Sequence, residues 1–112
     1  MTIFEKIASG EIPTSFVYEA PDFVAFRDIH PQAPVHVLII PRKCIARLGL
    51  AEKEHADLLG RMLLACPEIA AKMGVAESGY RIVINNGRDA GESVPHLHLH
   101  LLGGRNLLWP PG

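Results

Sequence analysis

An α+β fold with a single antiparallel sheet is the fold class that the sequence predicts, and three features predict it. The chain has about five short extended segments, most of them close enough in sequence to pair as hairpins. Two helical segments accompany them, one short at the start and one long near the middle. Near the carboxyl end, three of the six histidines alternate with leucines, the pattern of a strand with one buried face. The 112 residues are enough for one domain with its own core.

The first predicted elements are a short helix and a hairpin. Thr2 followed three residues later by Glu5 has the spacing of a capping box, and Gly10 ends the helix. Residues 15–19 and 23–28 are rich in aromatic and β-branched side chains, and a turn with a proline separates them. The two segments are therefore predicted to be adjacent strands.

A bend, a buried strand and the long helix come next. The bend spans residues 28–34, where two prolines lack backbone donors and restrict the residues before them. Residues 35–41 are almost continuously apolar, which is typical of a central, well-buried strand. Apolar residues then recur at helical spacing from Leu50 to about Met73, and Pro67 inside this stretch predicts a kink or a helix in two pieces.

The last predicted elements are two strands joined by a loop. Gly74 ends the long helix, residues 79–85 form a strand, and the loop 86–92 leads to the histidine strand, 96–102. Because successive side chains of a strand point to opposite faces, we expect the leucines to build core and the three histidines to share the other face. Neighbours on that face lie about 6.6 Å apart along the strand. The three imidazoles can therefore lean toward one small anion or metal ion.

Composition excludes several classes of function. The formal net charge is −1 and no run of Lys or Arg is present, so nucleic acid is not an expected partner. Cys44 and Cys66 form no Cys-x-x-Cys pair, which suits free thiols in a reducing cytosol. The start of the chain lacks the pattern of a signal peptide, and no apolar run approaches membrane-spanning length. We expect a soluble cytoplasmic protein.

Three interpretations of the histidines are open on the residues alone. The first is plain surface polarity on an edge strand. The second is zinc binding, although zinc sites usually add cysteines or a carboxylate, and Glu92, the acid just upstream, lies in a loop that looks flexible. The third is chemistry at phosphorus, in which a neutral imidazole attacks and its neighbours donate to phosphoryl oxygens. The unperturbed imidazole pKa of about 6.5 and the donors offered by nearby glycines and by Ser93 favour this third interpretation.

A family resemblance rests on the same residues. The run 96–102 reads His-Leu-His-Leu-His-Leu-Leu, the histidine triad motif, and the chain resembles the Hint branch of the histidine triad (HIT) superfamily over nearly its whole length. The resemblance implies one HIT domain over residues 1–112, with a sheet that continues across a two-fold homodimer. The helix 50–73 would lie at the seam, and the tail, about 103–112, would reach the partner subunit. The other matching segments are 2–4, 11–13, 28–34, 36–41, 79–81, 91–94, 103–105 and 109–112.

The resemblance also implies an activity. The protein would be a purine nucleoside phosphoramidase that cleaves the P–N bond of adenosine 5′-phosphoramidates, and acyl-adenylates, through a nucleotidyl-histidine. His98 would attack the α-phosphorus while its other nitrogen donates to a main-chain carbonyl. His96 and His100 would contact phosphoryl oxygens, and His36 would support the cluster from the neighbouring strand. Ser93 would bond the bridging atom or help to protonate the leaving amine.

Recognition of the nucleoside follows from the resemblance in the same way. Asp28 would accept from both ribose hydroxyls, although an aspartate before a proline-rich bend is also a common turn former. Asn85 would lie near the phosphate and the leaving group, Val94 would contribute a backbone N–H, and Trp109 would line the partner's pocket. An apolar slot for the base, or alternatively ordinary core, would be formed by Phe4, Ile7, Phe26, Ile29 and Leu38.

Some residues depart from the family pattern. Glu92 replaces a common glutamine, Pro95 stands where relatives often carry an aromatic, and no cysteine precedes Phe4 to match the zinc ligands of some relatives. We therefore expect no metal and no other cofactor. The alternative functions are hydrolysis of dinucleoside polyphosphates and a catalytically slow scaffold that binds purine nucleotides.

Overall fold

The fold is a five-stranded antiparallel sheet with one helix on each face. The computed structural model describes residues Met1–Gly112, and the strand order across the sheet is β1-β2-β3-β5-β4. This architecture confirms the predicted α+β class and places β3 at the centre. The strands are β1 (Phe16–Glu19), β2 (Phe23–Arg27), β3 (Val35–Pro41), β4 (Tyr80–Val83) and β5 (Leu99–Gly103).

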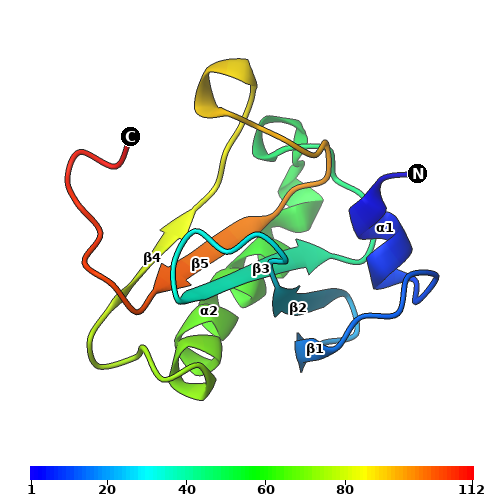
Figure 1. The fold of residues 1–112 in the computed structure, drawn as a ribbon. Helices are drawn as coiled ribbons and strands as arrows, with labels where there is room; N and C mark the ends of the chain where they lie inside the picture. The colour runs from blue at the N-terminus through cyan, green and yellow to red at the C-terminus, as the bar shows by residue number, and fades with distance from the viewer.

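The two helices cover opposite faces of the sheet (Figure 1). The long helix α2 (Ala56–Lys72) packs Met62, Ile69 and other apolar side chains on one face, where they form a cluster of 12 buried residues. The short helix α1 (Ile3–Ala8) belongs to a second cluster of 7 buried residues on the other face. Burial of these clusters makes the sheet a rigid support for the side chains on its α1 face.

Strand alternation sorts the residues of β3 and β5 between these faces. Leu99 and Leu101 belong to the cluster beneath α2, and His100 between them therefore points to the α1 face. His100 is the cross-strand partner of Leu38, which belongs to the α1 cluster. The prediction that leucines and histidines occupy opposite faces is confirmed for this strand.

The histidine strand is shorter than predicted. Strand β5 begins at Leu99, so His96 and His98 precede it. The pairing with β3 ends at Ile39 and Leu99, and Pro41, two residues on, has no N–H to extend the ladder. The Leu97 N–H donates instead to the Ile45 carbonyl at 2.6 Å. Because His96 and His98 lie outside the strand, their side chains need not alternate strictly between the two faces of the sheet.

The helices correct two further expectations. Helix α2 begins at Ala56 rather than at Leu50, because the 3₁₀ turns Leu48–Leu50 and Lys53–His55 take up the preceding residues. Pro67 lies inside one uninterrupted helix, so the two-piece alternative is wrong. The capping box of α1 is present as predicted, with the Thr2 hydroxyl accepting from the Glu5 N–H. Neither helix combines the length and apolar character needed to cross a membrane.

Candidate active site

His98 is held with one ring nitrogen available. Its Nδ1 lies 2.7 Å from the carbonyl oxygen of His96, and a carbonyl oxygen only accepts, so Nδ1 carries the proton. In the neutral ring, Nε2 then bears a free lone pair. The side chain is 5% exposed and packs edge-on against the Phe4 ring, with centroids 5.0 Å apart. This is the protonation state that an attacking imidazole needs.

A chain of hydrogen bonds sets the neighbouring histidine. The Gln32 N–H donates to His36 Nδ1 at 3.0 Å, so the proton of neutral His36 resides on Nε2. That N–H donates to His100 Nδ1 at 2.9 Å, which leaves His100 with its own proton on Nε2. The rings of His98 and His100 lie 4.9 Å apart. The cluster thus offers a lone pair on His98 beside a donor on His100.

Burial keeps both supporting rings neutral. Desolvation is the main cause that lowers the pKa of His36, and the negative charge of Asp28 opposes it. Burial, followed by the charges of His98 and His36, lowers the pKa of His100 to about 4. The carboxylate of Asp28 lies 3.5 Å from His36 Nε2 and also accepts from the His30 N–H at 2.8 Å. Asp28 is therefore a turn former that at the same time borders the site.

Both ring nitrogens of His96 are bonded inside the protein, on the α1 side where His98 also packs against Phe4, and the contact of His96 with phosphoryl oxygens stays a prediction. The ring is fully buried, and its Nε2 donates to the Pro41 carbonyl at 2.8 Å. Nδ1 is then the bare nitrogen, and the Thr2 hydroxyl donates to it at 3.1 Å. Burial is also the main cause that lowers the pKa of His96. With both nitrogens bonded inside the protein, His96 acts on the site through its main-chain carbonyl, which holds His98.

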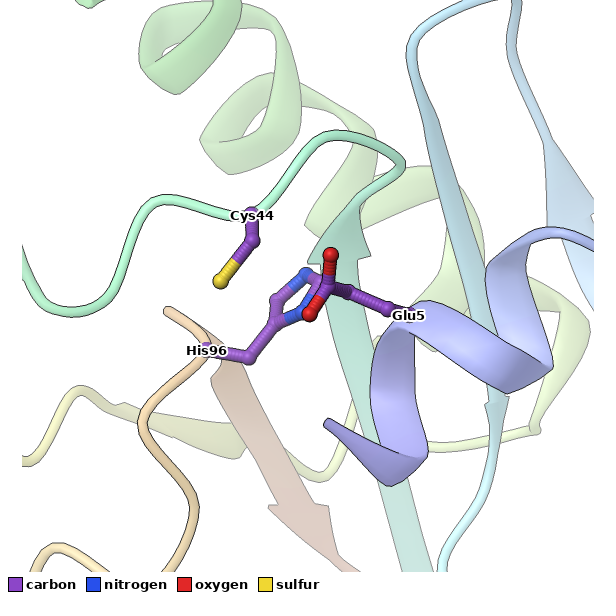
Figure 2. Close-up of side chains that lie close together, drawn as sticks. All are labelled: Glu5, Cys44 and His96. Atoms are coloured by element: carbon purple, nitrogen blue, oxygen red, sulfur yellow. The ribbon is translucent and has the colours of Figure 1, made fainter. Parts of the chain in front are cut away.

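Two groups of metal-ligating side chains lie close together. Figure 2 shows Glu5, Cys44 and His96, whose ligand atoms lie within 4.8 Å of one another. Their hydrogen bonds disfavour an ion: His96 has no free lone pair, and the Cys44 thiol donates to the Pro95 carbonyl at 3.4 Å. The second group is the Asp28, His36 and His100 cluster, where the facing nitrogens of the two rings bond to each other. We assign no metal to either group, and the absence of a metal requirement stays a prediction.

An apolar pocket of about 510 Å³ is lined by Phe4, which packs against His98, and by Leu38, the cross-strand partner of His100. Helix α1 and strands β2 and β3 supply its walls, and the segment before the histidines supplies its rim. The pocket unites eight residues that the sequence predicted for the site, namely Phe4, Ile7, Phe26, Asp28, Ile29, Leu38, Ser93 and Val94. The other lining residues, such as Ile12 and Thr14, were not predicted as site residues, and they reach the pocket because the chain turns back after α1.

Two predicted site residues lie apart from this pocket. Trp109 is 81% exposed, and the Arg81 guanidinium sits over its ring at 5.9 Å. The carboxyl end lies on the opposite side of the molecule from α1 (Figure 1), so Trp109 does not line the pocket of its own chain. Asn85 lies two residues beyond β4, past the pair formed by Val83 and His100, and does not line the pocket.

The loop before the histidines is anchored, contrary to its flexible appearance in the sequence. The Glu92 carboxylate accepts from Arg47 Nε at 2.9 Å, from Arg47 Nη2 at 3.0 Å and from the Gly87 N–H at 2.9 Å. The Arg47 hydrogen bonds are the main cause that lowers the pKa of Glu92 to about 2. The two partners are 45 residues apart, so no local pattern could reveal the pair. It fixes the residue next to Ser93 at the pocket rim.

Known proteins resemble this chain in sequence and in structure. Residues 9–107 match the model of the HIT domain. A HIT-like protein of Synechococcus elongatus is 57% identical over 111 residues, which cover 99% of this chain and 96% of that protein. Adenylylsulfatase HINT1 of Arabidopsis thaliana is 51% identical over 113 residues, with 99% of this chain and 76% of that protein covered. The crystal structure of a HIT family hydrolase from Legionella pneumophila superposes with a TM-score of 0.96 at 47% identity, covering 100% of both chains.

Proposed function

Because the chain belongs to the HIT superfamily, in its Hint branch, we propose that this hydrolase cleaves purine nucleoside phosphoramidates through a nucleotidyl-histidine. The observation that carries the proposal is the bond from His98 Nδ1 to the His96 carbonyl, because it leaves Nε2 bare on a ring that packs against Phe4, a wall of a pocket of nucleoside size. The substrate would be an adenosine 5′-phosphoramidate, and the product adenosine monophosphate.

The reaction takes place in two steps. The Nε2 lone pair attacks the α-phosphorus, the P–N bond breaks with its electron pair going to nitrogen, and the leaving amine takes up a proton. Ser93, exposed at the pocket rim, can donate to that amine. Water then attacks phosphorus, the bond to His98 breaks, and the nucleotide leaves. The His100 Nε2–H donates to a phosphoryl oxygen in both steps, which stabilises the charge that develops there.

The pocket accounts for recognition of the nucleoside. Its apolar walls can hold the base without discriminating adenine from guanine, and the Asp28 carboxylate retains lone pairs for the ribose hydroxyls. The Val94 N–H would contribute to phosphate binding, and Asn85 to the leaving-group side. The name of the Arabidopsis relative supports adenylyl sulfate as a second substrate, in which a P–O bond breaks and sulfate leaves.

We propose that Trp109 contributes to the site of the partner subunit in a homodimer. Strand β4 is an edge of the sheet, and its Arg81 contacts the tail, where the apolar side chains of Leu108 and Trp109 are 72% and 81% exposed. An edge strand with exposed apolar neighbours favours pairing with a second copy. In such a dimer the tail would carry Trp109 to the partner's site.

Steady-state hydrolysis of a fluorogenic adenosine phosphoramidate tests the proposal. We expect turnover by the wild type, its loss in His98→Ala, and little change in His55→Ala, a histidine that lies outside the pocket and the histidine cluster. Faster cleavage of diadenosine triphosphate than of the phosphoramidate would favour the dinucleoside polyphosphate hydrolase. Tight binding of adenosine monophosphate without turnover at high enzyme concentration would favour the scaffold.

A further inference from the structure

We propose that Thr2 is a positioning residue for the nucleophile: its hydroxyl holds the His96 ring in place, and through His96 the carbonyl that orients His98. The inference rests on the proposed function, because it treats His98 as the attacking group. It starts from three bonds in series, Thr2 Oγ1 to His96 Nδ1 at 3.1 Å, His96 Nε2 to Pro41 O at 2.8 Å and His98 Nδ1 to His96 O at 2.7 Å.

The direction of each bond is determined by chemistry. Pro41 O can only accept, so His96 carries its proton on Nε2, and its Nδ1 can only accept from Thr2. The Thr2 oxygen in turn accepts from the Glu5 N–H at 3.0 Å. One hydroxyl therefore performs two tasks: its lone pair caps helix α1, and its proton satisfies the buried His96 ring.

Loss of the hydrogen bond from Thr2 to His96 would also change the position of His98. His96 is fully buried, and its ring packs edge-on against Phe4 with centroids 5.9 Å apart, so no solvent replaces a lost donor. Without the Thr2 donor, Nδ1 is a buried acceptor with no partner, and this penalty favours a displaced ring whose bond to Pro41 O is weakened. The carbonyl that holds His98 belongs to the same residue and shifts with it.

Helix α1 connects the pocket with the hydrogen bonds of His96 and His98. Phe4, two residues after Thr2, lines the pocket and packs against the rings of both His96 and His98. Helix α1 thereby supplies a wall for the base and the hydroxyl that sets the histidines. The charged and titratable groups that face His96 are Glu5 from α1, Cys44 from the loop after β3, and His98.

Two substitutions separate the two tasks. Thr2→Ser keeps the acceptor for Glu5 N–H and the donor to His96. Thr2→Asp keeps an excellent cap acceptor, but its carboxylate has no proton to donate and faces the bare Nδ1. In Thr2→Asp we expect His96 to take a proton on Nδ1, because a carboxylate favours that form.

The experiment combines ¹⁵N NMR of the histidine rings with steady-state kinetics. In Thr2→Asp we expect the His96 Nδ1 resonance to change from an unprotonated to a protonated nitrogen. We expect kcat to fall about 10-fold, since misplacing a reacting group has effects of this order, and KM to stay within about 2-fold because the pocket walls are intact. Thr2→Ser should keep the wild-type His96 Nδ1 resonance and the wild-type kcat. The midpoint of thermal unfolding should show that both variants are folded.

The outcomes distinguish this inference from the proposed function. An unchanged His96 Nδ1 resonance in Thr2→Asp, or a kcat equal to that of the wild type, would overturn the role of Thr2. The NMR measurement needs no substrate, so it decides the tautomer even for a wild type that fails to cleave phosphoramidates. That failure would overturn the proposed function alone.

Discussion

Replacement of His36 tests the hydrogen-bond chain that sets His100. Phenylalanine fills the volume of this 6%-exposed side chain but offers no donor to His100 Nδ1 and no acceptor for the Gln32 N–H. A hydrogen bond of this kind contributes about 0.5–1.5 kcal/mol. That energy favours the His100 tautomer with its proton on Nε2, so His36→Phe should lower kcat by roughly 2–10-fold.

The stability of the variant should fall as well. Gln32 is exposed, and water can replace its lost acceptor. His100 Nδ1 is half-buried and left without a partner, which costs about 1–3 kcal/mol of unfolding free energy. Urea unfolding followed by circular dichroism measures this loss independently of activity.

A double-mutant cycle gives the decisive comparison. His100→Ala removes the phosphoryl donor itself and should lower kcat by about 100–1000-fold. Because His36 acts through His100, adding His36→Phe to His100→Ala should change kcat by less than about 3-fold. Fully additive losses, or an unaltered kcat in a folded His36→Phe variant, would refute the chain from Gln32 to His100.

Three further predictions concern the supports of the site. Gly104→Ala should lower the unfolding free energy by about 1–3 kcal/mol, measured in urea, because Gly104 has a φ of +89° and a Cβ would lie 2.9 Å from Pro34 Cβ. The pKa of Glu92 is held at about 2, below its usual 4.5, so its contribution to stability is present above pH 4.5 and is lost as the pH falls toward 2; Arg47→Met should shrink this loss in acid-unfolding curves. Trp109→Ala should change the unfolding free energy by less than about 0.5 kcal/mol, because the indole is 81% exposed, yet weaken self-association in sedimentation experiments.

Each of these three predictions would be contradicted by a specific result. Gly104→Ala with unaltered stability would mean that the turn accepts a Cβ without strain. Acid-unfolding curves of Arg47→Met that superimpose on those of the wild type would contradict the role of the ion pair. A Trp109→Ala protein that associates as strongly as the wild type would remove the tail from the dimer proposal.

Features that depend on neighbours in sequence were predictable. The capping box needs only Thr2 and Glu5, and the burial of β3 follows from its apolar run. The α+β class and the superfamily follow from the order of the elements and from the motif around His98. The start of α2 was placed too early because apolar periodicity cannot distinguish a helix from the 3₁₀ turns that lead into it.

Features that depend on distant partners were not predictable. The hydrogen bonds of His96 involve Pro41, 55 residues away, and Thr2, 94 residues away, so alternation alone could not show that both of its ring nitrogens are occupied. The ion pair of Glu92 with Arg47 is likewise invisible to local reasoning. The motif correctly brings the histidines together, but only the tertiary hydrogen bonds determine which nitrogen each ring presents.

Trapping of the covalent intermediate shows directly whether His98 is the nucleophile. An adenosine phosphoramidate is mixed with the enzyme, the reaction is quenched within the first turnover under conditions that preserve phosphohistidine-type bonds, and the digested protein is mapped by mass spectrometry. We expect adenylate on Nε2 of His98, and no adduct in His98→Ala. Turnover with adenylate on a different side chain, or with no adduct at any quench time while the burst of amine is observed, would contradict this expectation.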